Sequence, residues 1–198
     1  MINQDVLNLN VFCNDSNPVL KYIRVEEKQS MAANGNLLGI VSNPVGNDAD
    51  YPLCDGKETL KETYISNKTA KNFKMLKTKT SLKGRLENIV LLKKEGIANA
   101  ITLYNTNLDS AQSVDEVLDI QSYPEYTQII PTEEPVITID FDIRELKKMV
   151  DYLAKFDTRE WPIAKLSLYG TEKAMKVECT IPDVKNFTGL IMPMEINR

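Results

Sequence analysis

The acidic residues of the C-terminal third are the first candidates for chemistry. Asp140 and Asp142 form an Asp-x-Asp pair, with Glu133, Glu134 and Asp157 as further carboxylates nearby in the sequence. Carboxylates at such spacing could hold Mg²⁺ in a nuclease-like site. However, Asp142 directly precedes an apolar helical pattern and is expected to cap that helix, and no third ligand has motif spacing. We therefore predict no metal site and keep a metal-dependent enzyme only as a third hypothesis.

Other common catalytic arrangements are missing from the sequence. The chain has no histidine, which removes the commonest general base and every Ser-His or Cys-His nucleophile pair. No GxGxxG or GxxxxGK[ST] phosphate-binding loop occurs. Cys13, Cys54 and Cys179 are far apart and odd in number, which favours reduced thiols in the cytoplasm over a disulfide framework. The sequence therefore predicts a protein that is not an enzyme and needs no cofactor.

Basic residues are concentrated in one stretch of the chain. Residues 68–85 contain seven Lys or Arg and no Asp or Glu, and since the net charge is −4, the remaining residues carry −11. A positive strip on an acidic body can attract a polyanion locally. A solvated helix face is the plainer alternative. We predict that this strip contacts DNA phosphates through Lys68, Lys71, Lys74, Lys77, Lys79, Lys83 and Arg85.

Helices are expected to present many of these basic residues. The clearest helix begins near Asp142, because Asp142 and Glu145 form a capping-box pattern. Its apolar stripe at helical spacing consists of Ile143, Leu146, Val150 and Leu153. Three basic residues outside the stripe form a second predicted DNA contact: Arg144, Lys147 and Lys148. Shorter helices are predicted over Asn67–Leu76, capped by Ser66 or Asn67, and more weakly over Gln4–Phe12.

Short apolar runs between turn residues predict the strands. They cover Val19–Val25, Leu37–Val41, Glu87–Leu92, Ile97–Tyr104, Val114–Ile120, Val136–Phe141, Ala164–Tyr169, Ala174–Cys179 and Thr188–Met192. The order strand, helix, then about three antiparallel strands occurs at about 58–121 and 135–193. An abbreviated copy without its opening strand is expected in 1–50. A repeat of this length suits a duplicated α+β module.

Four segments resemble a known family in the correct order along the chain. Tyr123–Pro131 (YPEYTQIIP) resembles the YPDY-x-x-V-I-P signature of bacterial DNA polymerase III beta subunits, the replicative sliding clamps. Leu190–Ile196 (LIMPMEI) resembles the family's ending, two apolar residues and MPMR. Ser30–Leu38 (SMAANGNLL) is similar to the ATDGHRL turn, and Asn17–Glu26 (NPVLKYIRVE) to RPVLNGVLLE.

This resemblance implies an α+β fold of DNA-clamp-like βαβββ repeats, with antiparallel sheets on one side and helices on the other. About three repeats are expected, the first one abbreviated. Residues 1–128 would match the middle domain of the family, 129–134 a linker, and 135–198 the C-terminal repeat of the last domain. The family has three domains of two repeats each, so the chain would hold about half of that content.

The resemblance also implies a groove for partner peptides between the middle and last domains. Carried over by position, its residues are Gly35, Asn36, Leu37, Pro124, Gln128, Ile129, Leu190, Ile191, Met192, Pro193 and Met194. Methionine suits a surface that accepts several peptides, because its side chain is flexible and polarizable. Alternatively, Met192 and Met194 simply complete a core strand, since period-two alternation puts both on one face.

Departures from the family pattern fall on this groove. Asn36 and Leu37 replace His-Arg, while Gln128 and Glu195 each replace an arginine. Three lost positive charges would weaken the capture of acidic or C-terminal groups in a peptide. We therefore expect a partner set that differs from that of a housekeeping clamp.

The leading hypothesis is a clamp-like processivity factor. It would hold double-stranded DNA without sequence preference and tether DNA polymerase or other clamp-binding proteins. We expect a homo-oligomer in the cytoplasm, associated with the nucleoid. No apolar run approaches the roughly 20 residues of a membrane span, and no signal peptide is expected. The alternative is a non-encircling clamp-like adaptor or decoy from a phage or mobile element, which would bind protein partners.

Overall fold

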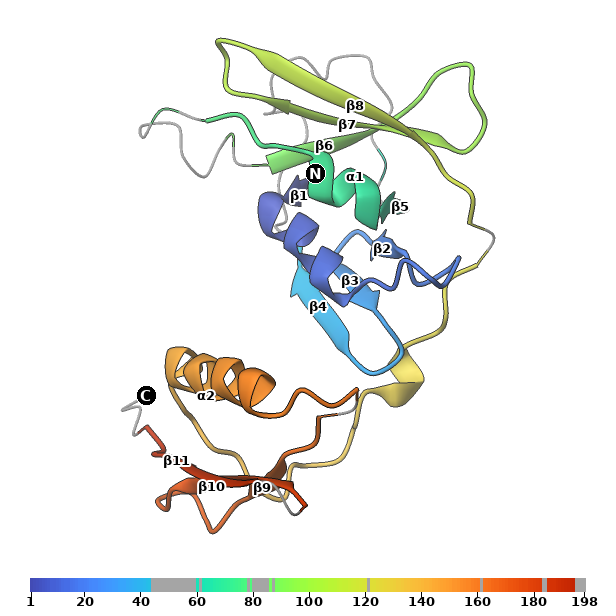
Figure 1. Ribbon diagram of the computed structural model, residues 1–198. Helices are drawn as coiled ribbons and strands as arrows, with labels where there is room; N and C mark the ends of the chain where they lie inside the picture. The colour runs from blue at the N-terminus through green and yellow to red at the C-terminus, as the bar shows by residue number, and fades with distance from the viewer. Residues whose placement is uncertain are drawn as a thin grey trace. The chain divides into compact units, whose positions relative to one another are not determined.

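In a computed structural model the chain forms two compact units, Met1–Gln128 (unit 1) and Ile129–Arg198 (unit 2). The structure describes residues 1–43, 60, 62–77, 79, 86, 88–120, 122–160, 162–182 and 185–194. Figure 1 shows that each unit combines antiparallel strands with helices. No helix among the described residues is long and apolar enough to cross a membrane.

Unit 1 is built from two successive sets of a strand, a helix and three strands. The first set is β1 (Ile2–Asn3), the 3₁₀ helix η1 (Gln4–Phe12), β2 (Tyr22–Val25), β3 (Gln29–Ala33) and β4 (Leu38–Ser42). The second set is β5 (Thr63–Ser66), α1 (Asn67–Asn72), β6 (Asn88–Lys93), β7 (Ala100–Thr106) and β8 (Ala111–Val117). A short 3₁₀ helix, η4 (Thr127–Ile129), follows these elements in the sequence.

The two sets exchange their opening strands. One sheet has the order β1-β6-β7-β8 and the other the order β4-β3-β2-β5, with all neighbours antiparallel. Each opening strand therefore pairs with the first strand after the helix of the other set. The exchange hydrogen-bonds each opening strand to a sheet and ties the two halves of unit 1 together.

A shared core lies beneath the two helices, which are in contact with each other and lie side by side in Figure 1. η1 contributes Val6, Leu7 and Leu9, all buried, even though its asparagines disfavour a long regular helix. The helix predicted over Gln4–Phe12 is thus confirmed, in 3₁₀ form. Core residues from α1 and both sheets include Ala70, Ile23, Val25, Ile65, Ile89, Leu91 and Leu103.

α1 is shorter than predicted, because it ends at Asn72 instead of Leu76. Phe73 takes an extended backbone conformation (φ −73°, ψ 111°) and buries its ring in the core. The N–H of Leu76 then donates to Oδ1 of the buried Asn105 on β7 at 3.1 Å. Core packing and β7 thus hold the chain where helical spacing alone predicted another turn.

The described part of unit 2 contains one α-helix and one sheet. α2 (Ile143–Phe156) lies over one face of the antiparallel sheet β11-β10-β9, formed by Lys185–Ile191, Met175–Ile181 and Lys165–Ser167 (Figure 1). Its core joins the sheet residues Met175, Val177 and Ile191 to Phe141 and to the helix residues Leu146, Met149 and Leu153. The α+β class, with antiparallel sheets on one side and helices on the other, is therefore confirmed.

The apolar stripe of α2 is only partly as predicted. Leu146 and Leu153 pack on the sheet, but Ile143 and Val150 are exposed. Met149 takes part in the packing instead, because it lies between Leu146 and Leu153 on the same helix face. Ile143 and Val150 therefore form a separate apolar row.

Two glycines allow a helix to lie close to a strand, one on β4 in unit 1 and one on β11 in unit 2. A Cβ on Gly189 of β11 would lie 2.7 Å from Sδ of Met149 and 2.9 Å from Cζ of Phe187. A Cβ on Gly39 of β4 would lie 2.6 Å from Cδ2 of Phe12 on η1. At both positions an alanine would force the neighbouring side chains to shift.

Most predicted strands correspond to observed ones, with shifted ends, but two expectations were wrong. β1 gives the first set a short opening strand, which the sequence was expected to lack. The segment Val136–Phe141, predicted as a strand, is not one, and Val136 is fully exposed. A strand needs a neighbour to satisfy its backbone groups, and the described part of unit 2 offers this segment little beyond Met194, whose N–H donates to the Asp140 carbonyl at 2.8 Å.

Candidate functional site

A groove in unit 2 runs between α2 and the end of β11. Its volume is about 660 Å³, and its walls are Asp142, Glu145, Lys148, Met149, Tyr152, Phe187, Leu190, Ile191, Met192, Pro193 and Met194. We call it the α2–β11 groove. The structure thus brings together the five predicted residues Leu190–Met194 along one wall. The helix wall was not predicted, because contacts between α2 and β11 join residues far apart in the sequence.

The two methionines of this wall are not core residues. β11 ends at Ile191, which is buried, whereas Met192 and Met194 are exposed. The hydrogen bond from the N–H of Met194 to the carbonyl of Asp140 holds this tail beside the start of α2. The side chains of Met192 and Met194 are therefore accessible at the groove, so the alternative of a completed core strand does not hold.

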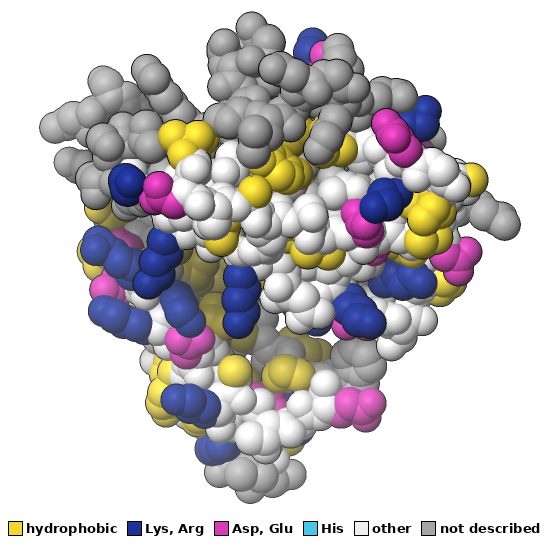
Figure 2. All heavy atoms as spheres, turned by 90° about the horizontal axis from the view of Figure 1, so that it is seen from above, with side chains coloured by type: hydrophobic (Ala, Val, Ile, Leu, Met, Phe, Trp, Pro, Cys, Tyr) yellow, Lys and Arg dark blue, Asp and Glu magenta, His cyan; other side chains and the backbone are white. Residues whose placement is uncertain are grey.

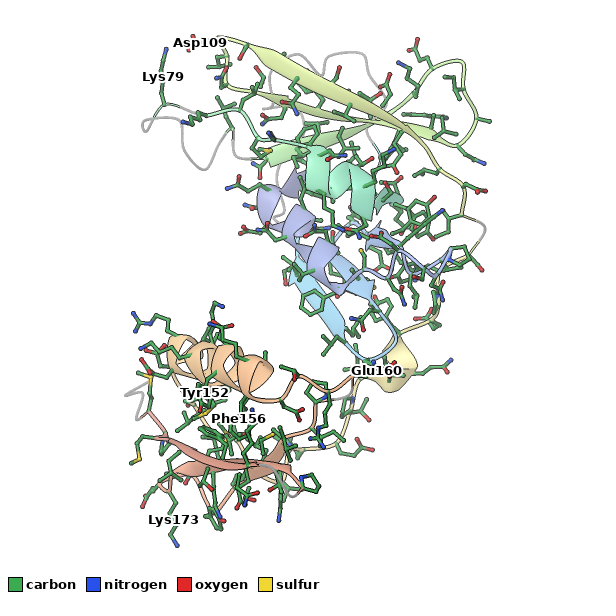
Figure 3. All side chains as sticks on the ribbon, viewed as in Figure 1. Lys79, Asp109, Tyr152, Phe156, Glu160 and Lys173 are labelled. Atoms are coloured by element: carbon green, nitrogen blue, oxygen red, sulfur yellow. The ribbon has the colours of Figure 1, made fainter. Side chains whose placement is uncertain are left out.

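Aromatic rings pack between helix and sheet, and two of them, Tyr152 and Phe187, line the groove. The ring centroid of Tyr152 lies 5.0 Å from that of Phe187, and the ring of Phe156 lies 5.7 Å from Phe187. Figure 3 shows Tyr152 and Phe156 on the side of α2 that faces the sheet. Rings at these separations pack favourably and are stiff, so they give the groove a preformed apolar surface.

Charged residues at the start of α2 line the same groove. Oδ1 of Asp142 accepts the N–H of Arg144 at 2.8 Å and so caps the helix as predicted. The Arg144 side chain also donates to this carboxylate, which lowers the pKa of Asp142 to about 2. Lys148 donates to Oε1 of Glu145 at 2.6 Å, and that hydrogen bond raises the pKa of Lys148. The groove therefore presents both acidic and basic side chains to a bound peptide.

The other predicted groove residues lie on exposed surfaces. Gly35, Asn36 and Leu37 form the turn between β3 and β4, where Gly35 has a positive φ of 99°. Oδ1 of Asn34 fixes this turn by accepting the N–H groups of Asn36 and Leu37, each at 3.0 Å. Pro124 and Gln128 of unit 1 and Ile129 of unit 2 are also exposed. Their participation in one groove with Leu190–Met194 stays a prediction.

The tyrosines of the YPEY segment anchor it to unit 1. Tyr126 is buried, and its hydroxyl accepts a hydrogen bond from Gln29 at 2.6 Å. The ring of Tyr123 stacks on that of Tyr64 with centroids 6.1 Å apart. Burial raises the pKa of Tyr123 to about 12. Sequence reasoning read this segment as a family signature and missed the partners that hold it.

The basic strip of unit 1 is exposed but only partly helical. Lys68 and Lys71 lie on α1, whereas Lys74, Lys77 and Lys79 lie beyond its end. Lys83 and Arg85 fall outside the described residues. Lys71 pairs with Asp15 at 3.4 Å, and Lys79 pairs with Asp109 at 3.2 Å (Figure 3). Lys68, Lys74 and Lys77 form no ion pair with another described residue, so they are the cations most available to an anion.

The three basic residues of α2 that were predicted to contact DNA are exposed, and each is matched by a carboxylate. Arg144 pairs with Asp142 at 2.6 Å, Lys147 with Asp151 at 2.8 Å and Lys148 with Glu145 at 2.6 Å. Figure 2 shows that basic and acidic side chains are also mixed elsewhere on the surface that it presents. Exposed ion pairs contribute only about 0–1 kcal/mol each, so a phosphate could displace the carboxylates.

Asp142 and Asp157, two of the carboxylates considered for metal binding, have other partners. Among the described residues, no three His, Cys, Asp or Glu side chains come together as metal ligands. Asp142 caps α2, and the buried Asp157 receives two hydrogen bonds from the side chain of Arg159 and one from its backbone N–H. Cys13 and Cys179 are free thiols, and Cys54 lies outside the described residues.

No family model matches the sequence, and no curated protein matches it. Several solved structures do match the chain. The beta subunit of DNA polymerase from Streptococcus pyogenes matches 98% of this chain at 12% identity and a TM-score of 0.63. The DNA polymerase sliding clamp of Bacillus subtilis matches 97% at 14% identity and 0.63. The C. crescentus beta sliding clamp, solved with bound PEG, matches 97% at 12% identity and 0.66.

The chain therefore has the fold of the bacterial DNA sliding clamps, which confirms at the level of fold the resemblance read from its sequence. It spans about half the length of the clamp chains that it matches, since the match covers 49%, 48% and 49% of them. Identities this low establish the fold and leave residue roles open.

Proposed function

We propose that the protein is a non-catalytic, clamp-like processivity factor that holds double-stranded DNA without sequence preference. The observation that carries this proposal is the clamp fold over 97–98% of the chain. Unit 1 would act as the middle clamp domain, residues 129–134 as a linker and residues 135–198 as half of the last domain. Its place in the cell would be the cytoplasm, at the nucleoid.

DNA would be held by phosphate contacts from Lys68, Lys74 and Lys77 of unit 1 and from the outer face of α2. Such contacts carry no sequence information, as a protein that slides requires. Encircling DNA also requires self-association, because the chain spans only about half of the clamp subunits it resembles. The proposed protein is therefore a homo-oligomer.

The α2–β11 groove would tether a polymerase or another replication protein by a short peptide. Its exposed methionines and preformed aromatic floor suit apolar anchor residues, and Lys148 can attract an acidic group beside them. A tether of this kind replaces repeated encounters with an intramolecular event at high effective concentration.

DNA topology provides the decisive test of clamping. The purified protein is incubated with bead-bound circular DNA, washed, and the circle is then cut once with a restriction enzyme. Retention on the circle followed by release on cutting is the expected result. Equal retention before and after the cut would contradict encirclement, and Mg²⁺-dependent degradation of the DNA would point to a nuclease instead.

The groove is tested with a fluorescent peptide that carries Leu and Phe anchors. Met192→Asp should weaken its binding at least tenfold, because a charge replaces an apolar contact. Leu108→Asp, a change at an exposed leucine on the β7–β8 turn, is the matched control and should bind as the original protein does. Equal binding by both variants would exclude the groove.

A non-encircling adaptor is the second candidate, and one observation favours it. Arg144, Lys147 and Lys148 are all paired with carboxylates, which weakens the positive field that α2 would present to DNA. Such an adaptor would bind the peptide normally yet be indifferent to whether DNA is circular or linear.

A further inference from the structure

In unit 1, every strand that directly follows a helix is covered by an opening strand from the other set. Ile65 of β5 lies opposite Ile23 of β2, and Ile2 of β1 lies opposite Ile89 of β6. Ile23 and Ile89 are both 0% exposed. The register is also the same at both junctions, because the helix-capping residues Asn3 and Ser66 face the first residue of the strand. We call this pairing of an opening strand with the strand that follows a helix a junction. Unit 1 contains two complete junctions.

Unit 2 has the same kind of strand without its cover. β9 directly follows α2 and is an edge strand of the sheet in the described part of the unit. Leu166 lies opposite the core residue Val177, so its side chain belongs to the face that α2 covers. Yet Leu166 is 56% exposed and Leu168 is 43% exposed. By their place after the helix, these two leucines correspond to the isoleucine, valine and leucine residues of β2 and β6 that are buried in the core of unit 1.

The segment that would supply this cover is also present in unit 2, where it pairs with no strand of the described part. The segment Val136–Phe141 leads into the cap Asp142 in the same way that β1 and β5 lead into the caps Asn3 and Ser66, which are their last residues. Ile137, Ile139 and Phe141 alternate with other residues, which is the pattern of a half-buried strand. Phe141 already packs against the core, as Ile2 and Ile65 do one residue before their caps. The start of the segment is exposed.

In its described part, the helix layer of unit 2 is also incomplete when it is compared with that of unit 1. In unit 1, η1 and α1 contact each other. α2 is the one helix of unit 2 in its described part, and it exposes an apolar row in which Ile143 is 75% and Val150 is 53% accessible. A second helix packed along this row would complete the two-helix layer that unit 1 has.

We propose that unit 2 is completed by unit 2 of a second copy of this chain, through reciprocal exchange of the segment Val136–Phe141. Each copy carries both halves of the junction, so one two-fold axis satisfies both edges at once. By the register of unit 1, Phe141 of one copy lies opposite Leu166 of the other, and Asp140 lies opposite Ser167. Asp142 then faces Lys165, a pair of opposite charges across the strands.

A second copy fits these edges better than an unrelated strand. An arbitrary peptide could pair with β9, but it would leave Val136–Phe141 without a ladder and the Ile143–Val150 row exposed. The exchange would pair Val136–Phe141 with β9 and would bury the Ile143–Val150 row. It would also cover the free edge of β9, which proteins otherwise have to protect. The inference goes beyond the proposed function, because the exchange would hold whether or not the assembly encircles DNA.

Disulfide trapping tests the register without disturbing the core. Directly opposed residues of antiparallel strands have Cα atoms about 4.5–5.5 Å apart, within disulfide range. The double variant Asp140→Cys with Ser167→Cys should form covalent dimers on mild oxidation, and each single variant should not. The equivalent residues of unit 1, Tyr64 and Arg24, are directly paired. Monomers alone, or a link within one chain, would refute the exchange.

Mass in solution tests the interface independently. By light scattering the protein should contain an even number of chains of 22.4 kDa. Leu166→Asp should halve that mass, because it places a charge inside the junction. Leu108→Asp, at a leucine with the same 56% exposure in unit 1, should leave the mass unchanged. A single-chain mass for the original protein, or an unchanged mass for a folded Leu166→Asp variant, would overturn the proposal.

Discussion

The hydroxyl group of Tyr126 accepts a 2.6 Å hydrogen bond from the side-chain amide of Gln29, a residue 97 positions earlier in the chain. The same hydroxyl donates to Oε2 of Glu26 at 3.3 Å, and Arg24 pairs with Glu26 at 2.7 Å. Burial raises the pKa of Tyr126, and the charge of Glu26 adds to this effect. The cluster fastens the end of unit 1 to β2 and β3.

Removing this hydroxyl should destabilise unit 1. In Tyr126→Phe the half-buried amide of Gln29 loses the shorter of its two hydrogen bonds and Glu26 loses a donor, so the free energy of unfolding should fall by about 1–2 kcal/mol. Urea unfolding measured by circular dichroism checks this value. Tyr169→Phe, at an exposed tyrosine of unit 2, is the control and should lie within about 0.5 kcal/mol of the original protein. Equal stability of both variants would show that the cluster contributes nothing.

Gly189→Ala should strain the contact between α2 and β11. The added methyl group collides with the end of the Met149 side chain, which lines the α2–β11 groove. We expect a loss of about 1–3 kcal/mol in unfolding free energy, as is usual for overpacking. The double variant with Met149→Ala should lose less than the sum of the two single changes. Strict additivity in urea unfolding would mean that Met149 is not the obstacle.

Acid should weaken unit 2 through Asp157. Hydrogen bonds from Arg159 hold the pKa of this nearly buried carboxyl far below its usual value of 3.8. The stabilising effect is therefore present above pH 3.8 and is lost as the pH falls through the lower, folded-state pKa. The difference in unfolding free energy between the original protein and Asp157→Asn should stay constant above about pH 5 and shrink below it.

Urea unfolding at a series of pH values measures that difference. Asp142, whose pKa is about 2, titrates in the same acid range, but it is present in both proteins and cancels from the comparison. A difference that did not change with pH would mean that Arg159 does not favour the ionised form of Asp157.

Salt dependence should reveal which lysines contact DNA. Each phosphate contact contributes about 0.9 to the slope of log K against log salt concentration. Lys74→Ala should reduce the slope by about that amount, because Lys74 is exposed and has no carboxylate partner among the described residues. Lys173 lies on the side of the unit 2 sheet away from α2 (Figure 3), and Lys173→Ala should leave the slope unchanged. Fluorescence anisotropy with duplex DNA supplies both slopes, and equal slopes would count against this surface.

Local patterns were enough to predict much of the fold. The cap Asp142 and the spacing of Leu146 and Leu153 predicted α2, because capping and helix periodicity depend on neighbouring residues only. Leu190–Met194 could be assigned to a groove because they form one contiguous motif that resembles the ending of the clamp family. The length of α1 could not be predicted, since Phe73 and Leu76 are held by residues of the distant sheet.

Pairing between distant segments was decided by the tertiary structure alone. Alternation marks Val136–Phe141 as a strand, but a strand exists only where another chain segment satisfies its N–H and C=O groups. Similarly, nothing in the spacing of Tyr152 and Phe187 shows that their rings meet and form the floor of a groove. Periodicity says which face of an element is apolar, while burial and long-range hydrogen bonds determine what that face meets.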